Sequence, residues 1–142
     1  MEAKASGRNI GISRKDSVEV ANFVRGKMVS KVKVMLEGVI DKKVVVPFRR
    51  YNRDRGHKRG KVAAGRYPVK TSTEFLKLLK SAESNAINKG MNADDLFISA
   101  IIANKGNGQM HHGRKRGREM KRTHLEIEVK EVNKKKKEIK TQ

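Results

Sequence analysis

TSTEFLKLLKSAESNA, residues 71–86, is the stretch of this sequence that says most about the fold. It opens with a capping box at Thr71 and Glu74, a pattern that satisfies the free N–H groups at a helix start. Behind it, apolar residues recur every three or four positions and form one continuous stripe. The stripe consists of Phe75, Leu78, Leu79, Ala82 and Ala86. Gly90 follows where a helix commonly ends, so we predict an amphipathic helix that packs on a core.

Two further helices are predicted before this one. Ser13 and Asp16 form another capping box, and Val20, Phe23 and Val24 follow at helical spacing until Gly26, which is expected to end the helix. Ser30 is the expected cap of the second helix. The apolar face of that helix would consist of Val32, Met35, Leu36, Val39 and Ile40.

Strand patterns follow the third helix. Residues 96–104 form an apolar run typical of a strand buried on both faces. Leu125, Ile127 and Val129 alternate with polar residues, which indicates a strand with one wet face. Ile10 and Ile12 predict an additional edge strand. The predicted fold class is α+β: a small three-stranded antiparallel sheet packed on three helices, with a long protruding β-hairpin and a basic extended loop.

Charge dominates the composition. The chain of 142 residues has 35 Lys or Arg against 15 Asp or Glu, a net charge of +20, and only 36% hydrophobic residues. Ordinary globular domains have roughly 45–50% apolar residues. So much like charge is self-repulsive in a free protein and is relieved by a polyanion, of which nucleic acid is the densest available. We therefore expect a nucleic-acid partner.

Several classes of protein are disfavoured. The chain has no cysteine, which excludes disulfides, thiolate nucleophiles and Cys-type zinc sites. No apolar run follows residues 1–4, and the longest one, residues 96–103, is far shorter than the ~20 residues of a membrane span. A cytoplasmic protein without a membrane association is expected. Metalloprotease, Walker-loop and nucleophile-elbow motifs are missing from the sequence, so we predict no enzymatic activity, cofactor or small-molecule substrate.

Two basic excursions interrupt the apolar pattern. Residues 42–70 hold eleven Lys or Arg and one acid, and residues 104–122 hold seven Lys or Arg, four Gly and one acid. Neither is expected to belong to the core. A single domain would span residues 1–132, and residues 133–142 would form a basic, disordered tail.

The first excursion contains FRRYNRDRGHKRGK, residues 48–61, in which half of the side chains are cationic. Arginine binds phosphate bidentately and stacks on bases. Phe48, Tyr51 and the nearby Tyr67 would offer aromatic faces to unstacked bases, which suits irregular RNA. A solvated basic linker is the alternative, but a linker has little need for aromatic side chains.

The second excursion joins two strands that are expected to pair. Its 19 residues exceed the two to five usual for a hairpin loop, so the segment is either a flexible loop or, as we favour, two strands that continue outward as a ribbon. Its tip would lie within residues 110–116. Arms of about nine residues would reach on the order of 30 Å. His111 and His112 are adjacent, point to opposite faces of a strand and therefore make a poor metal site; no metal is expected.

Three segments resemble the universal large-subunit ribosomal protein family L-twenty-two, called L-seventeen in older eukaryotic naming. Residues 24–27 are similar to its R-G-K motif, and LLKSAESNA at residues 78–86 resembles its L-L-K-S-A-x-x-N-A block. Residues 116–118 and 123–127 resemble the return arm of its hairpin and the strand after it. VPFRRYN at residues 46–52 is similar to the archaeal and eukaryotic branch.

The resemblance implies an α+β body near the polypeptide exit of the large subunit and a hairpin threaded through ribosomal RNA. The implied partners are large-subunit ribosomal RNA, neighbouring large-subunit proteins and the nascent polypeptide in the exit tunnel. The implied roles are contact with several RNA domains and assistance in assembly. The residues expected to bind RNA are Arg14, Lys15, Arg25, Lys27, Arg49, Arg50, Tyr51, Arg53, Arg55, His57, Lys58, Arg59, Lys61, Arg66, Arg114, Lys115, Arg116, Arg118, Lys121 and Arg122. Those expected at the tunnel tip are Met110, His111, His112, Gly113 and Arg114.

An architectural DNA-binding protein remains the alternative, because cationic β-arms also enter the minor groove of DNA. A basic protein of membrane surfaces is disfavoured, since no helix pattern places a strongly apolar face opposite a cationic one. Composition alone does not separate RNA from DNA as the partner.

Overall fold

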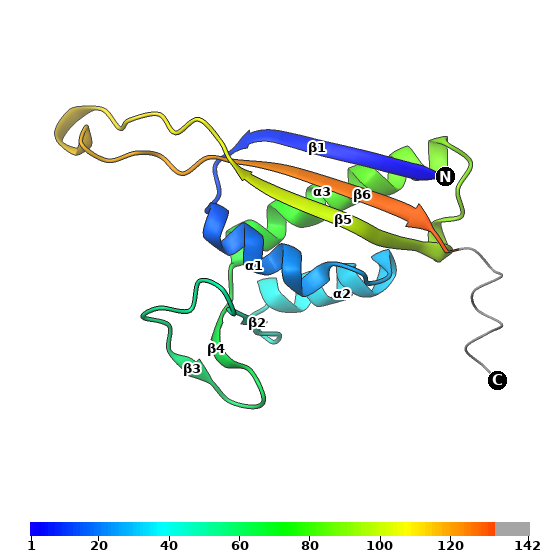
Figure 1. The fold of residues 1–142 in the computed structure, drawn as a ribbon, viewed down its shortest axis with the longest axis horizontal. Coiled ribbons are helices and arrows are strands. Elements are labelled where there is room, and N and C mark those ends of the chain that lie inside the picture. The colour runs from blue at the N-terminus through cyan, green and yellow to red at the C-terminus, as the bar shows by residue number, and fades with distance from the viewer. Residues whose placement is uncertain (133–142) are drawn as a thin grey trace.

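The main sheet is centred on the last strand of the chain. The computed structural model describes residues 1–132, and the tail expected at residues 133–142 lies outside the described residues. β6 (Thr123–Glu131) pairs antiparallel with β1 (Glu2–Ile10) on one side and with β5 (Leu96–Lys105) on the other. Figure 1 shows α1 and α2 below the sheet and α3 passing behind it. The predicted α+β class and three-stranded antiparallel sheet are confirmed.

Burial alternates along β6 as the sequence predicts. Leu125, Ile127 and Val129 are buried, while their neighbours face the uncovered side of the sheet. Strand β5 is also buried on one face only. The predicted burial of β5 on both faces is therefore wrong. Ile98 and Ile101 are buried, but Ile102 is 42% exposed. Within residues 1–132 helices cover only one face of the sheet, so the apolar run has no second layer to enter.

The edge strand β1 is longer than predicted. It runs from Glu2 to Ile10, and Ile12 lies beyond its end, although that side chain is buried. The buried residues of β1 are Ala3 and Ala5, which lie opposite Val129 and Ile127 of β6. Alanine has a low strand propensity and gives a weak pattern, so the sequence indicated only the C-terminal end of this strand.

All three predicted helices are present, and three of the five helix ends that the sequence marked by caps are found where expected. α1 (Arg14–Val24) begins as predicted, with the Ser13 hydroxyl accepting a 3.4 Å hydrogen bond from the Asp16 N–H. Gly26 after α1 and Gly90 after α3 adopt the positive φ that favours glycine.

The predicted caps of the other two helices are wrong. α2 (Val29–Ile40) has Met28 as its N-cap, two residues before the predicted cap Ser30, and the Met28 side chain makes no capping hydrogen bond. α3 (Val69–Asn88) begins directly after Pro68, which places Thr71 and Ser72 as buried residues inside its first turns. Proline is favourable at a helix start because it has no N–H to satisfy, and this signal prevails over the capping box.

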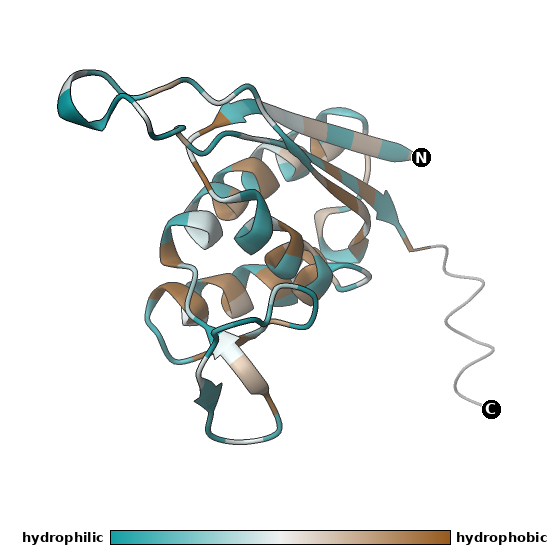
Figure 2. Ribbon diagram, turned by 60° about the vertical axis from the view of Figure 1, so that its left-hand side comes forward, coloured by the Kyte–Doolittle hydropathy of each residue, from teal (hydrophilic) through white to brown (hydrophobic). Residues whose placement is uncertain are grey.

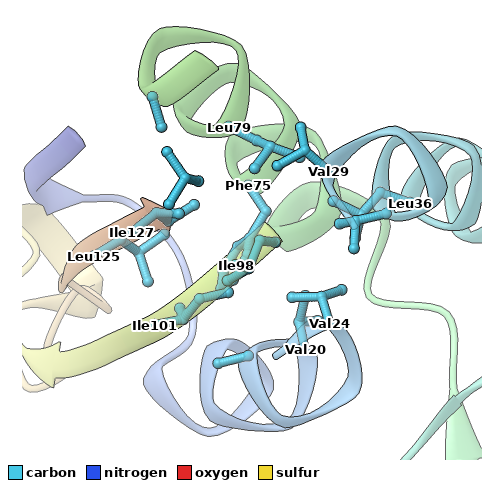
Figure 3. Close-up of a cluster of buried hydrophobic side chains, with 14 of the residues drawn as sticks. Val20, Val24, Val29, Leu36, Phe75, Leu79, Ile98, Ile101, Leu125 and Ile127 are labelled. Carbon is cyan, nitrogen blue, oxygen red and sulfur yellow. The ribbon is translucent and has the colours of Figure 1, made fainter. Parts of the chain in front are cut away.

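The core lies between the sheet and the helices. α3 packs across β1 and β6, α1 packs beneath β5, and α2 packs beside α3. Figure 3 shows side chains from all three helices and from β5 and β6 meeting in one cluster. The predicted stripe of α3 is largely confirmed: Phe75, Leu79, Ala82 and Ala86 are buried, and Leu78 packs at the margin.

The first basic excursion contains a second, smaller sheet. β2 (Val46–Pro47) and β3 (His57–Lys58) both pair antiparallel with β4 (Ala63–Arg66). The expectation that this excursion avoids the core is wrong at two residues, since Val46 is fully buried and Phe48 is only 3% exposed. Both apolar side chains anchor the excursion beside α1, because their burial removes hydrophobic surface from water.

The second excursion protrudes from the body, as Figure 1 shows. The β5–β6 ladder ends at Lys105 and Thr123. Beyond it the arms remain joined by an isolated bridge between Met110 and Glu119 and by single hydrogen bonds, of which the Met120 N–H to Gln109 carbonyl bond is 2.7 Å. The arms are therefore paired but irregular, which glycines and mutually repelling cations favour. We call residues 106–122 the hairpin extension.

Candidate nucleic-acid interface

A buried carboxylate holds the start of the first excursion against the body. Glu19 of α1 is 1% exposed. Its two oxygens accept hydrogen bonds from the backbone N–H groups of Arg49 (3.1 Å), Arg50 (2.9 Å) and Tyr51 (2.7 Å). Successive N–H groups turned toward one point form a concave anion site. These bonds fix the backbone from which Arg49 and Arg50 extend outward, and both side chains are exposed.

The aromatic residues of this excursion are placed differently from the prediction. Phe48 is buried and is covered by the Arg55 guanidinium, 5.0 Å from the ring centroid. Its ring is therefore not available for stacking on a base. Tyr51 is half-buried, with Arg50 at 5.5 Å from its ring, and Tyr67 is half-buried with Lys58 at 5.5 Å. These aromatic rings support cationic side chains through cation–π contact.

The segment between α1 and α2 covers the free edge of β5. The Gly26 N–H donates to the Ile98 carbonyl and the Ile98 N–H donates to the Lys27 carbonyl, each at 3.0 Å. The Arg25 guanidinium donates to the Ile101 carbonyl at 2.9 Å. Exposed strand edges invite unwanted pairing, so this part of the R-G-K motif has a structural role in addition to its predicted contact with RNA.

The Lys27 side chain turns back toward α1. Its ammonium donates to the Phe23 carbonyl and lies 4.5 Å from the Phe23 ring centroid. Burial lowers the pKa of Lys27 below the ordinary lysine value, and the nearby Lys31 charge lowers it further. Arg25 and Lys27 therefore each make contacts within the body.

Other predicted cations point outward along the excursions. In the first excursion Arg53, Lys58, Arg59 and Lys61 are exposed, and so is the imidazole of His57. A short 3-10 turn (Gly113–Lys115) closes the hairpin extension, and Figure 2 shows the extension as mostly hydrophilic. The exposed cations at or beside this turn are Arg114, Lys115, Arg116 and Arg118. No ion pair within residues 1–132 engages them, so their charge is available to an external anion.

The predicted tip residues lie at the end of the hairpin extension. The His111 N–H donates to the Arg118 carbonyl at 2.9 Å, which holds the two arms together just before the turn. Met110 and His112 are exposed and Gly113 has a φ of +66°. Among the described residues no cluster of His, Cys, Asp or Glu could hold a metal ion. No helix in residues 1–132 has the length and apolar character that crossing a bilayer requires.

The structure gathers one subset of the predicted residues in a single cleft at the beginning of α1. The cleft is lined by Arg14, Lys15, Arg55, Arg66, Lys121 and Arg122, together with Lys105, which the sequence did not mark. Glu19 was missed as well. An acid within a helix gives no sequence signal by itself, because its burial depends on a loop 30 or more residues away.

A compact α+β body that carries two exposed cationic excursions is typical of a structural ribosomal protein. The family model for ribosomal protein L22p/L17e matches residues 5–130. The chain belongs to this family, and the predicted resemblance is confirmed. The family is a structural and non-enzymatic one.

Similar proteins come from archaea, which confirms the archaeal and eukaryotic branch. Large ribosomal subunit protein uL22 of Methanococcoides burtonii is 45% identical over 119 residues, covering 82% of this chain and 78% of that protein. The uL22 protein of Staphylothermus marinus is 41% identical over 141 residues and covers 92% and 90%. The uL22 protein of Nanoarchaeum equitans is 44% identical and covers 91% and 78%.

Proposed function

We propose that this chain is a structural constituent of the large ribosomal subunit and binds large-subunit ribosomal RNA through both basic excursions. The observation that carries the proposal is the distribution of charge. Exposed cations without an acidic partner concentrate on the first excursion and the hairpin extension, whereas the apolar residues form a separate core. Contacts between such cations and phosphate groups supply much of the affinity of nucleic-acid-binding proteins.

RNA fits this surface better than duplex DNA. Sequence readout of duplex DNA commonly places a helix or a regular β-ribbon in a groove. Here the three helices are occupied in the core, and the hairpin extension is irregular beyond Lys105. Irregular cationic loops suit folded RNA, which presents loops, bulges and closely spaced backbones. The far ends of the two excursions would contact different parts of the RNA and so help the particle to assemble.

The hairpin extension would place its turn on the wall of the polypeptide exit tunnel. Family membership supports this position, and the exposed turn at residues 113–115 offers no apolar surface that would need burial against the body. Residues 110–114 would then face the nascent polypeptide. Neighbouring large-subunit proteins would contact the remaining surface of the body.

Competition binding tests the proposal against the DNA-binding alternative. The full chain is bound to labelled large-subunit ribosomal RNA and is challenged with unlabelled RNA or duplex DNA at equal phosphate and equal salt. We expect the RNA to displace the label at much lower concentration. Equal or stronger displacement by DNA would favour the architectural DNA-binding function instead.

A further inference from the structure

The cleft at the beginning of α1 lies where the two excursions approach each other. Figure 1 shows α1 beginning between the root of the hairpin extension and the small sheet. Arg14 and Lys15 come from the first turn of α1, and Arg55 and Arg66 come from the first excursion. Lys105 ends β5, while Lys121 and Arg122 precede β6. Cations from four separate stretches of the chain therefore line one concave surface.

The acids in the cleft do not neutralise this charge. Seven of the lining residues are cationic and two, Asp16 and Glu119, are acidic. Asp16 lies 3.9 Å from the Arg55 guanidinium and Glu119 lies 3.5 Å from the Lys105 ammonium. Each acid therefore offsets one cation. The five other cations have no ion pair within residues 1–132.

The geometry favours an extended anion over isolated contacts. Like charges from different elements repel one another, and their closeness costs stability until an anion is bound. A concave arrangement concentrates the positive potential at its centre, and the amino-terminal end of α1 adds to it. Met120 also lines the cleft and provides apolar surface against which a sugar can pack.

We propose that this cleft binds the sugar–phosphate backbone of one RNA strand, so that consecutive nucleotides contact the first excursion and the root of the hairpin extension together. The inference rests on the proposed function and adds a specific site to it. The cleft has a volume of about 490 Å³, which lies within the range of small-molecule pockets and admits a single strand more readily than a duplex. Glu19 assists, because it fixes the backbone at residues 49–51 from which the Arg55 loop continues.

Site-directed cross-linking to RNA tests the single-strand claim. The chain has no cysteine, so a single introduced cysteine gives one thiol for a photoreactive group. The two cleft variants are Arg66→Cys and Lys121→Cys, and the control is Lys80→Cys. All three side chains are exposed, which leaves the fold intact. Each labelled full-length variant is bound to large-subunit ribosomal RNA and its cross-links are mapped by primer extension. We expect Arg66→Cys and Lys121→Cys to mark the same short run of nucleotides, and Lys80→Cys to mark none of it.

Two outcomes would overturn the inference while leaving the proposed function standing. One is that the two cleft positions mark separate RNA segments, and the other is that neither position cross-links although the variants bind RNA as the unmodified chain does. If the unmodified chain fails to prefer this RNA over duplex DNA, the proposed function itself fails and the inference fails with it.

The salt dependence of RNA affinity tests the cleft independently, with a control variant that removes the same amount of charge. The cleft variant combines Arg66→Ala, Lys105→Ala and Lys121→Ala. The control variant removes the same charge from the exposed faces of α2 and α3 by combining Lys31→Ala, Lys77→Ala and Lys80→Ala. Each lost contact with a single strand lowers the slope of log affinity against log salt by about 0.7. We expect the cleft variant to lose about 2 from this slope and the control to lose much less. Equal losses in both variants would contradict the cleft site.

Discussion

The carboxylate of Glu19 in α1 accepts a 2.7 Å hydrogen bond from the backbone N–H of Tyr51, a residue 32 positions later in the chain. The same carboxylate binds the N–H groups of Arg49 and Arg50. One buried acid thus joins the helical body to the most basic part of the sequence. The charge of Glu19 is satisfied by these N–H groups, so the neighbouring arginine side chains remain free for an external partner.

Removing the Glu19 carboxylate should release the first excursion. In Glu19→Ala the three backbone N–H groups lose their acceptor, and we expect the free energy of unfolding to fall by on the order of 2–3 kcal/mol. Denaturant unfolding followed by circular dichroism measures the loss. Limited proteolysis should show faster cleavage within residues 49–61 under conditions in which the body stays folded.

The matched variant is Glu19→Gln, which keeps the side-chain shape. Its amide oxygen can still accept from Arg50 and Tyr51, whereas its NH₂ group meets the Arg49 N–H. We expect a loss between those of the unmodified chain and Glu19→Ala. Full stability together with unchanged proteolysis in Glu19→Ala would show that the excursion does not depend on this contact.

Gly90 ends α3 in a conformation that other residues adopt at a cost. Its φ is +76°, and its N–H donates to the Ile87 carbonyl at 2.8 Å. Gly90→Ala should lower the free energy of unfolding by about 1 kcal/mol because a Cβ strains this backbone conformation. Gly117 has no positive φ and no atom near the position of an added Cβ. Gly117→Ala is therefore the control, and an equal loss in both variants would contradict the assigned helix end.

Lys27 should titrate below the other lysines. Burial disfavours its ammonium form, and the Lys31 charge lowers its pKa further. The carbon-13 shift of its ε-carbon, followed by NMR against pH, measures this pKa, and Lys31→Ala should raise it. Because the folded protein then binds fewer protons than the unfolded chain, stability should increase as pH rises from the folded pKa of Lys27 to its ordinary value. A Lys27 pKa at the ordinary lysine value would contradict the observed burial.

Cations at the end of the hairpin extension should be dispensable for folding. Arg114, Lys115 and Arg116 are exposed and lie outside the core. Replacing all three with Ala should leave far-UV circular dichroism unchanged and shift Tm by only a few degrees. Incorporation into large subunits should decline, as quantified by mass spectrometry of purified particles. An unfolded body after this change would mean that the core is assigned incorrectly.

The parts of the fold that follow a local pattern were predictable from sequence. The stripe from Phe75 to Ala86 indicated α3, the alternation at Leu125 and Ile127 indicated β6, and Ser13 marked the start of α1. Each signal is contained within a single helix or a single strand. The basic excursions were also visible, because charge density needs no knowledge of tertiary structure.

Features that depend on distant partners were not predictable. Ala3 and Ala5 become strand residues because β6 lies beside them, and Phe48 is buried because α1 provides a surface for it. Glu19 is buried because a loop wraps its carboxylate in N–H groups. The cleft cations Arg66 and Lys105 are far apart in sequence and come together only when both excursions fold beside α1.

Retention on ribosomal particles tests the central claim most directly. A cell lysate that contains the full chain is washed at roughly 0.5 M salt, which strips non-specific cationic binding, and is sedimented through a sucrose gradient. We expect the chain to remain with the large subunit, since RNA contacts by both excursions and the cleft hold it in the particle. Release of the chain to the top of the gradient, or its sedimentation with DNA, would contradict the account.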